Sequence, residues 1–161
     1  MFYLWLHLLS FSIYFGATAA VPLICLPMAS AESEPRRRLG VLAGFMRVYD
    51  PLTIAVLGIV LMTGAYSLTG FKDALRADFF RQMGGMLMWK LGWFFVLVNV
   101  AAYMAFGLGN RLVRRHHEGE EVDPAWVDSM IRRLRVSSVL ALLLCALIVW
   151  IALGMTKGVN A

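Results

Sequence analysis

The stretch VSSVLALLLCALIVWIALGMT, residues 136–156, contains no Asp, Glu, Lys or Arg. An apolar run of about 20 residues is the length of helix that crosses the hydrocarbon core of a bilayer. Three other stretches are similar, because 2–31 and 51–71 carry no charged side chain and 82–110 carries only Lys90. The sequence therefore predicts four transmembrane helices, over about 3–29, 40–70, 84–110 and 125–156.

The composition of the whole chain agrees with this prediction. The 161 residues are 60% hydrophobic and only 16% charged, whereas soluble domains are roughly half apolar and a quarter charged. This composition excludes a soluble enzyme, a secreted disulfide scaffold and a sequence-specific DNA-binding protein. We expect a single all-α domain over 1–161, folded as a four-helix transmembrane bundle. The lipid bilayer is its first partner, and no nucleic-acid partner is expected.

The basic residues predict how the bundle is oriented. Most lie in the first and third connectors: Arg36, Arg37, Arg38, Arg47, Arg111, Arg114, Arg115, Arg132, Arg133 and Arg135. The second connector and the C-terminal end hold only Lys72, Arg76, Arg81 and Lys157. Because cytoplasmic loops carry an excess of Lys and Arg, connectors one and three are predicted to be cytoplasmic and both termini to be outside. The expected location is a bacterial inner membrane.

Local signals refine the helix boundaries. Asp123-Pro124 is typical of an N-cap followed by proline at the first helical position. Asp50-Pro51 could be a second N-cap, but the apolar segment Leu39–Tyr49 before it favours a helix that begins near Leu39 and bends at Pro51. Two prolines, Pro22 and Pro27, are expected to kink or end the first helix toward its cytoplasmic side.

Two ionisable side chains stand out inside the otherwise uncharged stretches, His7 and Lys90. Such residues are costly in hydrocarbon and are candidate functional sites by default. Ser10, Tyr14 and Thr18 follow His7 at helical spacing, so they form a polar stripe that should face other helices or a cofactor. Lys90 lies roughly 9 Å of helical rise below the outer surface, at a depth that His7 can share.

This set of side chains suits haem ligation. A neutral imidazole on a transmembrane helix can be an axial ligand of b-type haem, and nearby cations can neutralise its propionates. His7 is the only histidine inside a span, so it is the predicted metal ligand, with Lys90 or the outer arginines facing the propionates. Met86 and Met88 are candidate second ligands, and Ser10, Tyr14, Tyr66 and Trp89 complete the predicted cofactor-binding set.

Other interpretations of the same residues stay open. His7 lies beside Tyr3 and Trp5 and could belong to an interfacial belt, while Lys90 could extend toward the same surface. A group of methionines, Met83, Met86 and Met88, would suit soft metals, which makes copper binding or transport a further hypothesis.

Several short motifs resemble one family of four-helix membrane proteins. They are His7 with Pro22 later in the same helix, the run Glu34-Pro35-Arg36-Arg37-Arg38 before a helix containing Pro51, Trp89-Lys90-Leu91, and the basic run Arg111–Arg115. Together they cover nearly the whole chain. They resemble the group that unites HemJ-type protoporphyrinogen oxidases with the CopD copper-resistance domain.

The resemblance implies b-haem bound by His7, with Lys90 as a functional and possible catalytic position. It also implies an oxidoreductase that takes electrons from a porphyrinogen and passes them to a respiratory acceptor, so a porphyrin or a quinone is an expected partner. Where the family often has histidine, tryptophan and arginine, this sequence has Met88, Tyr14 and Leu23.

The leading functional hypothesis is therefore a b-haem protein of electron transfer or porphyrinogen oxidation. The alternative is a non-catalytic accessory subunit of a larger respiratory, photosynthetic or oxygenase complex. Small residues such as Gly58, Gly64 and Gly92 would suit packing against a partner helix or a second copy of the chain.

Overall fold

The computed structural model describes the backbone of residues 2–75, 79–119 and 122–158. Within these ranges it describes every side chain except those of 68, 70–75, 79–83, 86 and 155–158. The described chain folds into four helical rods. The elements are α1 (Phe2–Ala20), η1 (Val21–Cys25), α2 (Leu26–Ala31), α3 (Pro35–Leu75), α4 (Phe79–Ala102), η3 (Tyr103–Gly109), α5 (Asn110–Glu118) and α6 (Pro124–Gly158).

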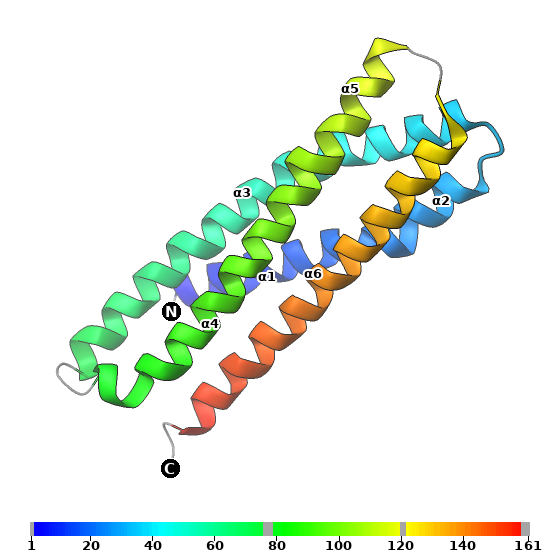
Figure 1. Cartoon of the computed structure of the whole chain (residues 1–161). Coiled ribbons are helices and arrows are strands. Elements are labelled where there is room, and N and C mark those ends of the chain that lie inside the picture. The colour runs from blue at the N-terminus through cyan, green and yellow to red at the C-terminus, as the bar shows by residue number, and fades with distance from the viewer. Residues whose placement is uncertain (1, 76–78, 120–121, 159–161) are drawn as a thin grey trace.

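The rods run side by side as a bundle with two distinct ends (Figure 1). We call the end with the turn Glu32–Glu34 and the start of α6 the basic end, because the arginines of α3, α5 and α6 gather toward it. The opposite end, where α1 begins and the last turns of α6 lie, is called the terminal end. α1 packs against α3 and α6, and α4 also packs against α6 and α3. α1 and α4 thus occupy opposite corners of the bundle.

Each rod contains a helix long and apolar enough to cross a membrane, over Phe2–Ala31, Pro35–Ser67, Leu87–Glu118 and Pro124–Gly154. The predicted all-α four-helix transmembrane bundle is confirmed. Many large apolar side chains point away from the bundle, among them Phe95, Phe106 and Trp150. Outward apolar surface is what a lipid-embedded bundle requires, because lipid tails are as apolar as these side chains.

Two apolar clusters hold the bundle together. The first cluster, toward the basic end, joins all four rods through residues such as Val21, Leu42, Met46, Leu112 and Leu134. The second cluster lies toward the terminal end and includes Tyr14, Val56, Leu57, Leu97, Ala101, Ala141, Leu144, Cys145 and Ile148. The candidate site described below lies on the terminal side of the second cluster.

Three helix irregularities interrupt the regular α-helical pattern. η1 and η3 are π-helical turns. Pro22, which was expected to disturb the first helix, lies at the start of η1. Asp50 and Pro51 lie inside α3, which begins at Pro35 and is continuous to Leu75. The N-cap interpretation of Asp50 is therefore wrong. Figure 1 shows that the first part of α3, drawn in cyan, runs in a different direction from the rest.

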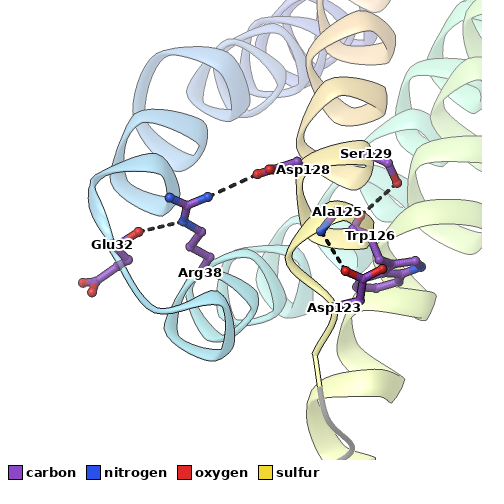
Figure 2. A network of polar contacts seen from close by, with 7 residues as sticks. All are labelled: Glu32, Arg38, Asp123, Ala125, Trp126, Asp128 and Ser129. Atoms are coloured by element: carbon purple, nitrogen blue, oxygen red, sulfur yellow. Dashed lines mark hydrogen bonds and ion pairs between the residues drawn. The ribbon is translucent and has the colours of Figure 1, made fainter.

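Side-chain contacts tie three rods together at the basic end (Figure 2). Arg38 donates from Nε to the Glu32 carbonyl at 2.7 Å and from Nη1 to Asp128 Oδ1 at 3.1 Å. The backbone N–H of Ala125 donates to Asp123 Oδ1 at 3.0 Å, which confirms the predicted N-cap of the fourth rod. The guanidinium group of Arg115 lies 4.7 Å from the centre of the Trp126 ring.

Candidate functional site

His7 faces helix α3. Its Nδ1 atom lies 3.0 Å from the backbone carbonyl oxygen of Val60 and 3.0 Å from Thr63 Oγ1. A carbonyl oxygen only accepts hydrogen bonds, so Nδ1 carries the hydrogen. Thr63 donates its own hydroxyl hydrogen to the Ile59 carbonyl at 2.6 Å, which leaves Oγ1 able to accept from His7 as well. Both contacts therefore fix the same orientation of the ring.

This arrangement decides which nitrogen is available for a ligand. In a neutral imidazole whose Nδ1 carries the hydrogen, Nε2 keeps the lone pair. Histidines that bind metals commonly donate their other ring N–H to a backbone carbonyl in this way. Among the described residues, no hydrogen bond occupies Nε2 of His7. The ring is thus held by α3 and presents a metal-binding nitrogen.

Gly64 provides the space beside the ring. A Cβ atom placed on Gly64 would lie 3.3 Å from Cε1 of His7 and 3.7 Å from its Nδ1. So short a contact would force the ring to move by a few tenths of an ångström. The imidazole therefore keeps its present position only while residue 64 is glycine. The close approach of α1 to α3 at this point depends on Gly64 in the same way.

Lys90 reaches the same region from α4. Its ammonium group lies close enough to His7 to act on it electrostatically. Lys90 is half-buried and joins no ion pair with any residue that the structure describes. The two ionisable residues of the predicted site thus lie within electrostatic range of each other, on α1 and α4, which both contact α3.

The predicted polar stripe on the first helix points into the bundle. Its members Ser10, Tyr14 and Thr18 are the three buried residues of α1. Thr18 Oγ1 lies 3.2 Å from the Tyr49 hydroxyl, so at least one member of the stripe has a polar partner on α3. Helical spacing alone therefore identified the inward face of this helix.

The other predicted cofactor-binding residues lie farther out. Tyr66 and Trp89 are exposed, and Tyr66 stacks on Tyr3 with ring centres 5.1 Å apart. Met88 is 73% exposed and faces away from the bundle interior. The side chain of Met86 lies outside the described residues, as do those of Met83, Arg76 and Arg81. Trp93, on the inward side of α4, packs edge-to-face against Trp89 at 5.7 Å.

The interfacial-belt interpretation applies to the neighbours of His7 more than to His7 itself. Tyr3 and Trp5 are exposed, as anchors in a membrane interface are. His7 is instead half-buried, with its ring bonded to α3. The imidazole therefore belongs to the packing contact between α1 and α3.

A b-type haem can be compared with these residues. The orientation of His7, fixed through Nδ1, suits one axial bond from Nε2. No group of three or more His, Cys, Asp or Glu side chains that could hold a metal ion occurs among the described residues. His116 lies at the basic end, beside Gly40. The described residues thus offer a potential haem one imidazole nitrogen, Nε2 of His7, and one positive charge on Lys90.

The burial of the Asp50 carboxylate and of the Trp93 indole nitrogen was not predicted. The Asp50 carboxylate lies against Gly109, and a Cβ atom at residue 109 would overlap it. Within the described part of the chain, Tyr14 Oη, Asp50 Oδ1 and Trp93 Nε1 are buried without a hydrogen-bond partner. The only sequence signal for Asp50 was an acidic residue before a proline, and this pattern also describes a helix start.

Models of protein families, curated proteins and solved structures were all compared with the chain, and none of them matches it.

Proposed function

We propose that this protein binds b-type haem through Nε2 of His7 and acts in electron transfer or porphyrinogen oxidation. The observation that carries the proposal is the pair of contacts from His7 Nδ1 to Val60 and Thr63, which orient the ring and leave Nε2 for a metal. Lys90, in electrostatic range of the same ring, supports it. When bound, haem supplies reversible one-electron chemistry.

Each residue of the chain has a distinct part in this proposal. Val60 and Thr63 hold the His7 ring, which increases the electron density at Nε2 and prevents rotation. Lys90 is the counter-charge for a carboxylate, such as a haem propionate or a porphyrinogen side chain. The apolar second cluster lies below the site and keeps water from the bundle interior.

The proposed orientation places this chemistry on the outer side of a bacterial inner membrane. The basic end carries most of the arginines, and an excess of positive charge marks the cytoplasmic side. His7 and Lys90 then lie near the opposite surface. A porphyrinogen or a quinone dissolved in the bilayer would reach them from the lipid.

The direct test is a reduced-minus-oxidised absorption spectrum of the purified full chain, expressed with haem supplied. The expected result is the α band of a b-type haem, lost in His7→Ala. The matched control is His116→Ala, because His116 lies at the basic end beside Gly40. A native protein without the α band, or one whose band survives His7→Ala, contradicts the proposal.

Lys90 is tested separately from haem binding. Lys90→Met removes the positive charge, and Lys90→Arg keeps it. If Lys90 meets an anionic group of the haem or the substrate, Lys90→Met lowers haem retention or porphyrinogen oxidation and Lys90→Arg restores part of it. Equal behaviour of the two variants contradicts an electrostatic role.

A further inference from the structure

Asp50 is an acidic side chain inside a transmembrane helix. It lies within the α3 segment Pro35–Ser67, followed directly by Pro51. Its Oδ1 atom is buried and has no hydrogen-bond partner, and the carboxylate joins no ion pair, among the residues that the structure describes. An ionised carboxylate without a partner costs several kcal/mol in such a place. A bound proton removes that cost.

The Asp50 carboxylate lies against the end of a π-helical turn of the neighbouring rod. The carboxylate fills the space where a side chain at Gly109 would lie, at the end of the π-helical turn η3. There the N–H of Asn110 donates to the Ala105 carbonyl, five residues back. Where that pattern returns to four-residue spacing, one backbone carbonyl loses its intrahelical donor. A protonated carboxyl group can donate to such a carbonyl, whereas a carboxylate can only accept.

Tyr49, next to Asp50 along α3, brings a hydroxyl group into contact with α1. The Tyr49 hydroxyl lies 3.2 Å from Thr18 Oγ1. Tyr14, which is fully buried one turn away on α1, has its hydroxyl near Thr18 but outside hydrogen-bonding geometry. From Tyr14 the polar stripe continues through Ser10 to His7, about 10 Å of helical rise farther on. The stripe is thus a continuous row of polar side chains on one helix face.

The charged residues nearest to Asp50 along these helices, Arg47 and Arg111, are exposed and do not neutralise it. The titratable groups in this layer are the hydroxyl of Tyr49 on α3 itself, the hydroxyl of Tyr14 on α1 and the thiol of Cys145 on α6. None of them carries a positive charge. A proton is therefore the cation that fits Asp50.

We propose that Asp50 is a proton-binding site inside the membrane bundle. This inference does not depend on haem binding, and its test uses the protein without haem.

The test is infrared spectroscopy of the full chain in lipid nanodiscs near pH 7, where exposed carboxylates with ordinary pKa values of about 4 are ionised. The expected spectrum contains the C=O band of a protonated carboxyl group that shifts in heavy water. Asp50→Asn removes this band, and Asp128→Asn, a change in an exposed carboxylate, leaves it. A native spectrum without the band, or a band unchanged in Asp50→Asn, overturns the proposal.

A second variant protects the test against misfolding. If Asp50→Asn does not fold, Asp50→Glu keeps a carboxyl group, and the band is expected to move in frequency without disappearing. A band at the native frequency in Asp50→Glu assigns it to another residue and overturns the proposal.

Discussion

At the scale of single residues, two glycines decide how closely ionisable side chains approach neighbouring helices. Gly64 lets the His7 ring lie against α3, and Gly109 lets the Asp50 carboxylate lie against η3. The Asp50 carboxylate occupies the place where a Cβ atom at Gly109 would be, and the His7 ring lies 3.3 Å from a Cβ atom placed on Gly64. Larger residues at these positions therefore change the chemistry as well as the packing.

Replacing Gly64 with valine is expected to displace His7. The added side chain overlaps the edge of the ring, breaks the contacts of Nδ1 with Val60 and Thr63, and lowers haem affinity by about 10-fold or more. The measurement is the haem content of the purified variant. Gly58→Val is the control, because no atom lies within 4 Å of a Cβ at Gly58. Equal haem content in both variants would show that Gly64 does not position the ring.

Gly109→Ala is expected to destabilise the bundle by about 1–3 kcal/mol, the usual cost of overpacking. The reason is the overlap of the new methyl group with the Asp50 carboxylate. Thermal unfolding in detergent measures the effect, with Gly92→Ala as the control because its Cβ would meet nothing within 4 Å. In an Asp50→Ala background the cost should largely vanish. Additive effects of the two substitutions would contradict the contact.

The sequence predicted some of these residues and not others for physical reasons. His7 and Lys90 are ionisable groups in otherwise uncharged stretches. Such groups are costly in lipid, so they are recognised from the sequence as candidate functional residues. Asp50 was not predicted as a buried polar residue, because the pair Asp50-Pro51 is also typical of the start of a helix. The role of Gly64 and Gly109 depends on which residues of other helices face them, and a single sequence does not contain that information.

At the scale of elements, hydrophobic runs predict helices but not their irregularities. A π-helical turn contains the same apolar residues as an α-helical one, so η1 and η3 leave no pattern in the sequence beyond Pro22. The apolar runs also underestimated the length of the helices at the basic end, where α3 begins at Pro35 and α5 continues to Glu118. Charged residues there extend the helices beyond the uncharged stretches.

Arg38 is expected to hold the turn before α3 against α6. Arg38→Ala removes its hydrogen bonds to the Glu32 carbonyl and to Asp128, and should lower the free energy of unfolding by about 1 kcal/mol. Arg37→Ala is the control, because Arg37 joins only an exposed pair with Glu34 and should change stability little. Thermal unfolding of the two variants provides the comparison. If Arg37→Ala costs as much as Arg38→Ala, the contact between rods does not contribute.

At the scale of the whole molecule, the distribution of charge predicts how the bundle sits in the membrane. The two described cysteines, Cys25 and Cys145, are buried. New cysteines at exposed positions of opposite ends can therefore report the side of the membrane on which each end lies. Ser33 lies in the turn at the basic end, and Thr69 lies on α3 toward the terminal end.

In intact bacterial cells, a membrane-impermeant maleimide is expected to label Thr69→Cys and not Ser33→Cys. The reason is that the arginine-rich end should remain in the cytoplasm. Labelling of both variants after cell lysis is the control for reactivity. The reverse pattern in intact cells would invert the orientation and place His7 on the cytoplasmic side.

The two π-helical turns and Pro51 have a consequence for bending. All three border the first cluster, on three different rods, and each removes or displaces backbone hydrogen bonds of its helix. Bending of the bundle is therefore expected between these residues, across the length of the first cluster. It would tilt the terminal end, which carries His7, relative to the arginine-rich basic end.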